Sequence, residues 1–109
     1  MEEEKSIYIS IPITGTDINK TMKRAEQIKG SLSHGKTRVV TPFDVVPLSD
    51  IEDMPEKEAY SYCLGKDIEA LLNADVVFFC KGWDFSNGCR AEHKVAEIYH
   101  KELIFESEV

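Results

Sequence analysis

Hydrophobic runs of two kinds predict four strands along the chain. Residues 6–11 alternate isoleucine with Ser6, Tyr8 and Ser10 and are stopped by Pro12, which is typical of a strand. Residues 75–80 (DVVFFC) are almost continuously apolar, as in a parallel strand covered on both faces. The predicted strands are 6–11, 37–41, 75–80 and 102–105.

Between these strands, apolar residues recur at helical spacing. The first predicted helix follows a turn at residues 14–17, can be capped by Thr16 or Asp17, and ends before Gly35. The second and third predicted helices are 56–73 and 87–101. Residues 43–55 form a long connection, of the kind that often serves as a lid or binding loop.

This alternation of strands and helices predicts an α/β fold. Right-handed crossovers then give a flavodoxin-like or Rossmann-like three-layer sandwich, with a parallel sheet of four to five strands and helices on both faces. We expect strand order 2-1-3-4, with the first strand central, in a single domain that covers residues 1–109.

Composition and charge narrow the class of protein. With 42% hydrophobic and 30% charged residues, the chain resembles ordinary globular proteins. Its longest apolar run, 76–80, is too short to span a membrane, and its acidic start is unlike a secretory signal, so we expect a cytoplasmic protein that does not bind membranes. The net charge of −7 argues against a nucleic acid polymer as partner.

The three cysteines do not predict a metal site or a disulfide framework. Cys63, Cys80 and Cys89 have no paired spacing and no accompanying histidine cluster. We therefore expect no metal and no cofactor, and we interpret Cys80 and Cys89 as packing residues.

Two acidic residues lie on helix faces that are otherwise apolar. Asp67 falls in the apolar arc of the second predicted helix, and Glu92 falls in that of the third. An unpaired carboxylate on a buried face costs roughly several kcal/mol or has a raised pKa, so such groups often mark functional sites. The alternative is a structural role, in which a buried acid caps a neighbouring backbone.

Ligands of such folds bind beyond the carboxyl ends of the strands. The turn around Thr14 and Gly15 offers amides and hydroxyls ahead of a helix, which could cradle a phosphate. The indole of Trp83 suits a base or sugar, although it could equally cover the sheet edge. The residues expected to bind substrate are Ile13, Thr14, Gly15, Trp83, Ser86, Asn87 and Gly88.

A carboxylate near a helix N-terminus, such as Glu92, can attack a carbon that is becoming cationic. Cleavage of a glycosidic bond has such a transition state and typically uses one carboxylate as nucleophile and a second acid as proton donor. Asp67 and Glu92 would serve this chemistry.

Three segments resemble motifs of the nucleoside 2-deoxyribosyltransferase-like superfamily. SIYISIPITG at 6–15 resembles its opening Y-x-A-G-P-x-x-G, and KDIEALLNADVV at 66–77 resembles its helix-to-strand segment. SNGCRAE at 86–92 resembles its S-x-G-x-x-x-E motif and is closest to the 2′-deoxynucleoside 5′-phosphate N-hydrolase branch. Overall, the chain is most similar to small uncharacterised members.

The resemblance implies a transferase or hydrolase acting on the N-glycosidic bond of a deoxynucleoside or its 5′-monophosphate. Glu92 would be the nucleophile, Asp67 the acid that assists departure of the base or orients the sugar, and Tyr8 a neighbour of the nucleophile. Ile11 departs from the family glycine and could crowd a ligand. Members often complete the site with a second subunit, so a homodimer is expected.

Two other functions remain open at this stage. The chain could be a non-catalytic nucleotide-binding module that keeps the pocket without turnover. It could also be a plain flavodoxin-like or receiver-like domain, although Cys80 stands where receiver chemistry needs an acid.

Overall fold

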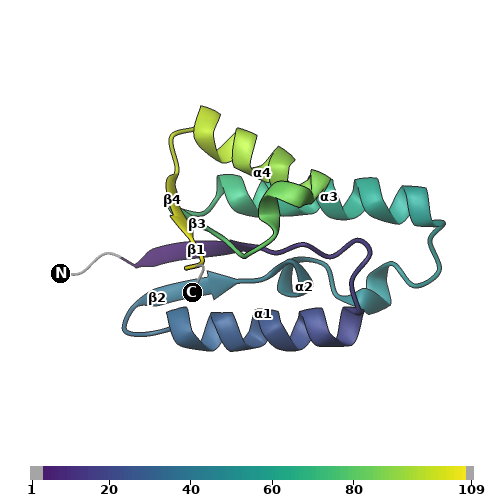
Figure 1. Cartoon of the computed structure of the whole chain (residues 1–109), viewed down its shortest axis with the longest axis horizontal. Coiled ribbons are helices and arrows are strands. Elements are labelled where there is room, and N and C mark those ends of the chain that lie inside the picture. Colours follow the sequence, from purple (N-terminus) through teal and green to yellow (C-terminus); the bar gives the residue numbers. More distant parts are fainter. Residues whose placement is uncertain (1–3, 108–109) are drawn as a thin grey trace.

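One all-parallel sheet forms the centre of the protein. The computed structural model describes residues 4–107, and its four strands lie in the order β2-β1-β3-β4 (Figure 1). The strands are β1 (Lys5–Ser10), β2 (Thr37–Val40), β3 (Val76–Phe79) and β4 (Glu102–Phe105). The predicted strand order and the central position of the first strand are confirmed.

Helices cover both faces of this sheet and make the predicted three-layer sandwich. They are α1 (Ile18–Leu32), α3 (Glu56–Leu72) and α4 (Asn87–Ile98). Helix α1 lies on one face, and α3 and α4 lie together on the other (Figure 1). Helix α4 ends three residues earlier than predicted, because His100 adopts a left-handed φ of 57° that a helix cannot continue through. No helix within residues 4–107 is long and apolar enough to cross a membrane.

The long connection before α3 is more ordered than the sequence predicted. It begins with the short helix α2 (Pro42–Val45) and contains a 3-10 turn, η1 (Leu48–Asp50). The side chain of Thr41 accepts a hydrogen bond from the Asp44 amide, and the Asp44 carboxylate accepts one from the Thr41 amide. Val46 is buried, so this segment packs against the domain and not away from it.

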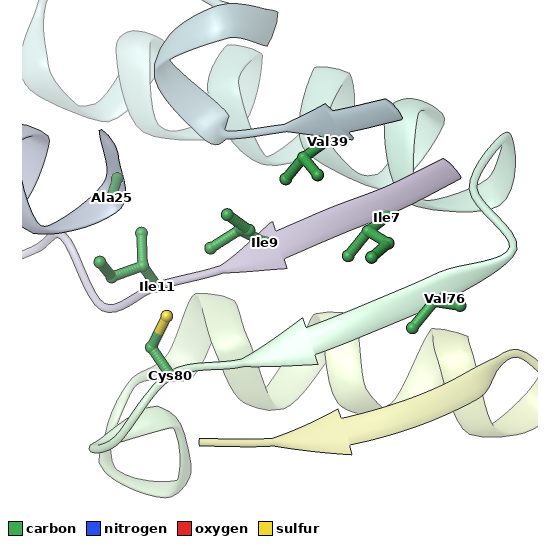
Figure 2. Close-up of a cluster of buried hydrophobic side chains, with 7 residues drawn as sticks. All are labelled: Ile7, Ile9, Ile11, Ala25, Val39, Val76 and Cys80. Carbon is green, nitrogen blue, oxygen red and sulfur yellow. The ribbon is translucent and has the colours of Figure 1, made fainter. Parts of the chain in front are cut away.

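The alternation along β1 assigns its side chains to two different layers. Ile7, Ile9 and Ile11 pack on the α1 side of the sheet, together with Ala25 and Cys80 (Figure 2). The intervening Tyr8 and Ser10 therefore face α3 and α4, since successive strand residues point to opposite faces. Ile11 is buried in the α1 cluster, on the face opposite to Tyr8.

Candidate active site

Two hydroxyl groups of β1 bind one carboxylate of α4. The Tyr8 hydroxyl donates a 2.8 Å hydrogen bond to Glu92 Oε2, and the Ser10 hydroxyl donates a 2.7 Å bond to Glu92 Oε1. Tyr8 and Ser10 are fully buried, and Glu92 is 4% exposed. Both carboxylate oxygens are therefore held by the sheet, and the side chain is fixed in one orientation.

A second acid lies against this arrangement from α3. Asp67 is only 8% exposed, close enough to the Tyr8 hydroxyl and to Glu92 for both to act on its ionisation. Its Oδ1 atom is buried and has no hydrogen-bond partner within residues 4–107. The structure thus brings together the three predicted catalytic residues and leaves one carboxyl oxygen unsatisfied, which in a native protein needs an explanation.

Both buried acids have raised pKa values. Burial, and then the charge of Glu92, raises the pKa of Asp67 to about 8, while the Tyr8 hydroxyl partly offsets this. Burial also raises the pKa of Glu92 to about 7, against the stabilising bonds from Ser10 and Tyr8. Glu92 accepts a hydrogen bond at each oxygen, whereas Oδ1 of Asp67 accepts none from residues 4–107, so when the pair holds one proton it resides preferentially on Asp67 and Glu92 is the carboxylate.

Tyr8 remains a neutral hydrogen-bond donor between the acids. Burial raises the pKa of its phenol well above 10.0, and the negative charges of Glu92 and Asp67 raise it further. A phenol has a single proton, which the structure assigns to Glu92.

The acids lie within the seam between α3 and α4. Leu71 and Ala96 form the apolar end of this seam and are fully buried. At the other end, the Tyr60 hydroxyl lies 3.7 Å from where a Cβ on Gly88 would stand. Tyr60 was not predicted from the sequence, although its position two helical turns before Asp67 puts it on the same face of α3.

The N-terminus of α4 lies at this end of the seam. Ser86 caps the helix, and its hydroxyl accepts a 3.3 Å hydrogen bond from the Cys89 amide. Asn87 is exposed, and Gly88 is half-buried. The amides of a first helical turn have no partners within the helix, so those of Asn87 and Gly88 are available to a group that binds at this end.

The first loop offers less to an anion than its sequence indicated. The Asp17 carboxylate caps α1 and accepts hydrogen bonds from the amides of Asn19 at 3.1 Å and Lys20 at 3.2 Å. Thr14 and Gly15 are exposed, while Ile13 packs against the α1 cluster. Two amides of the predicted phosphate-binding turn, those of Asn19 and Lys20, are therefore already bonded to the Asp17 carboxylate.

Trp83 lies in an aromatic cluster. In the short 3-10 turn η2 (Trp83–Phe85), its indole stacks on the His93 ring with centroids 4.4 Å apart. Phe79 and Phe105 complete the cluster, with centroids 5.4 and 5.5 Å from the indole. This placement fits the alternative interpretation, in which the indole covers the edge of the sheet.

The cysteines are free thiols, and Cys63 and Cys89 adjoin the acids. Cys80 and Cys89 are buried, and Cys63 is half-buried. Burial raises the pKa of the Cys89 thiol, and the neighbouring hydroxyls of Ser10 and Ser86 lower it in part. Across residues 4–107, no three His, Cys, Asp or Glu side chains are grouped as metal ligands.

A family description covers nearly the whole chain. Residues 5–105 match the model of a domain of unknown function, DUF4406. No curated protein matches the sequence.

Proposed function

This chain belongs to the DUF4406 family, and we propose that it cleaves or transfers at the N-glycosidic bond of a 2′-deoxynucleoside or its 5′-monophosphate. One observation carries the proposal. Glu92, held at both oxygens by Tyr8 and Ser10, lies beside the buried and unpartnered acid Asp67. A carboxylate next to a protonated acid is the pair of groups that glycosidic cleavage requires.

Each acid has a defined role in the proposed reaction. An oxygen of Glu92 attacks C1′ of the sugar, and the C1′–N bond breaks with its electron pair on the base nitrogen. Asp67 donates its proton to the departing base. Water or an acceptor hydroxyl then attacks C1′, releases Glu92, and gives a proton back to Asp67.

Burial favours the proposed role of each acid. In a site with little water, a negative carboxylate stabilises the developing positive charge of the sugar far better than it would in bulk solvent. The same burial keeps Asp67 protonated near neutral pH, because it raises the pKa of this group to about 8. A single environment therefore supplies both the nucleophile and the acid.

The end of the α3–α4 seam at the start of α4 is the proposed substrate entrance. Ser86, Asn87 and Gly88 lie there at the start of α4, where a sugar hydroxyl or a 5′-phosphate can meet helix amides. Tyr60 borders the same end from α3. A flat base that enters here reaches Asp67, whose free oxygen then gains a partner.

A second copy of the chain is the proposed partner, and the cytoplasm the proposed compartment. Large apolar side chains surround this end of the protein: Phe85 is 91% exposed, and Tyr60 is 44% exposed. A homodimer would cover such side chains and would help a small domain to enclose a ligand.

Release of free base tests the proposal. The protein is incubated separately with each of the four common deoxynucleosides and each of their 5′-monophosphates, and free base is measured by chromatography. Glu97→Gln is the matched control for Glu92→Gln, because Glu97 is an exposed acid of the same helix, paired with Lys94 at 3.3 Å. We expect release from wild type and Glu97→Gln, and loss of release in Glu92→Gln.

The runner-up function is a nucleotide-binding module without turnover. The near-complete burial of both acids favours it, because a reacting sugar must reach Glu92. This function predicts no free base from wild type and a substrate that raises the melting temperature equally in wild type and Glu92→Gln. That pattern would overturn the catalytic proposal.

A further inference from the structure

Ser10 is a buried polar residue whose position the proposed reaction does not by itself explain. Its hydroxyl is fully buried beneath α4 and lies 2.7 Å from Glu92 Oε1. The Cys89 thiol also adjoins this hydroxyl. A serine hydroxyl has one proton and two lone pairs, so it can donate to only one of these neighbours.

The Glu92 carboxylate is the stronger acceptor for that proton. A hydrogen bond to an ionised acceptor is shorter and about twice as strong as a neutral one, and 2.7 Å is within the range of a charge-assisted bond. The lone pairs of Ser10 then remain available to the Cys89 thiol, which stays protonated because burial raises its pKa.

The elements packed against Glu92 bring hydroxyl, thiol and carboxyl groups to it. Strand β1 supplies Tyr8 and Ser10, helix α3 supplies the acid Asp67, and α4 itself supplies the Cys89 thiol. Within residues 4–107, no basic side chain contributes to the ionisation of Glu92. The two hydroxyl groups are therefore the local groups that favour its negative charge.

We propose that Ser10 is the positioning residue of this site, which orients Glu92 through Oε1 and keeps it the charged member of the acid pair. The catalytic part of this inference rests on the proposed function. Without Ser10, Oε1 loses its donor in a buried environment, and the proton of the pair moves from Asp67 toward Glu92. A protonated Glu92 cannot act as the nucleophile.

Titration of the carboxyl carbons tests the inference without any substrate. The side-chain carboxyl groups of uniformly ¹³C-labelled protein are followed by NMR from pH 4 to pH 9, and Glu92 is assigned by its loss in Glu92→Gln. In Ser10→Ala we expect the titration midpoint of Glu92 to rise by about one to two pH units, the shift that corresponds to one lost hydrogen bond to a charged group.

Ser6→Ala is the matched control on the same strand. The Ser6 hydroxyl also donates to a carboxylate, Asp75 Oδ2 at 3.2 Å, but at the opposite end of β1. We expect this variant to leave the midpoint of Glu92 unchanged. An equal shift in both variants would show a general effect of the strand and would overturn the inference, as would an unchanged midpoint in Ser10→Ala.

A second pair of variants covers the case in which Ser10→Ala does not fold. Ser10→Thr keeps the hydroxyl, and Ser10→Val replaces it with a side chain of the same shape as threonine but without the hydroxyl. The titration midpoint of Glu92 must therefore be higher in Ser10→Val than in Ser10→Thr. Equal midpoints would overturn the inference. Base release is measured separately, and its absence from wild type refutes the proposed function. The titration midpoints still test whether Ser10 keeps Glu92 charged.

Discussion

Asp67 should destabilise the folded protein increasingly as the pH rises. Burial and the charge of Glu92 raise its pKa from 3.8 to about 8, and in the unfolded chain it returns to its ordinary value. Between these two values the folded state holds a proton that the unfolded state has released. Stability is therefore highest below about pH 4 with respect to this group and falls as the pH rises toward 8.

The size of the effect follows from the shift. A shift from 3.8 to about 8 is about four pH units, and at about 1.36 kcal/mol for each unit it amounts to about 5 kcal/mol at pH 8. Coupling to Glu92 shares part of this cost, so we expect Asp67→Asn to be more stable than wild type by about 3 kcal/mol or more at pH 8. Near pH 4 the two proteins should differ little, because Asp67 is largely protonated in the folded state and titrates only as the chain unfolds.

Urea unfolding from pH 4 to pH 8 measures this difference, and Asp75→Asn is the control of opposite sign. Asp75 accepts hydrogen bonds from the amide and hydroxyl of Ser6, and the backbone bond is the main cause of its lowered pKa. Asp75→Asn should therefore be less stable than wild type at pH 7, with the difference shrinking in acid. A gap between wild type and Asp67→Asn that does not widen with pH would refute the reasoning.

Four further predictions concern turnover and assembly. Glu92→Gln should lower base release by about a hundredfold or more, as when a main electrostatic stabiliser is lost, with the circular dichroism spectrum unchanged. Asp67→Asn should slow release most for the poorest leaving bases, which the rates for a series of bases would show. Tyr8→Phe removes the donor to Glu92 Oε2 and should move the acidic limb of the pH–rate profile up by about one unit. Light scattering at micromolar concentration should give the mass of a dimer, and a monomer would contradict the proposed assembly.

The sheet and its helices were predictable because hydrophobic periodicity reflects burial directly. The alternation of residues 6–11 and the apolar run before Cys80 specify strands that are covered on both faces. The positions of Asp67 and Glu92 were predictable for the same reason, since an acid within an apolar arc must be buried with the arc. These features depend on the local sequence and on one general rule of topology.

The missed features depend on contacts between distant segments. Ser10 occupies an ordinary polar position in an alternating strand, and only the packing of α4 over β1 buries it against Glu92. The stacking of Trp83 on His93 joins a loop to a helix face and has no local signal. In contrast, helix α2 carries the Thr41–Asp44 capping box and Pro42 at its start, which the sequence could have shown.

The strand order explains why the two acids meet above β1. Helix α3 connects β2 to β3, and because β1 lies between these strands, the crossover must pass over β1. Helix α4 packs beside α3 on the same face, so residues of both helices converge on the side chains that β1 presents there. Tyr8 and Ser10, two residues apart on that face of β1, bind the two oxygens of Glu92. With β1 at an edge of the sheet, the seam between the helices would lie over other strands, and the same acids would lack these two donors.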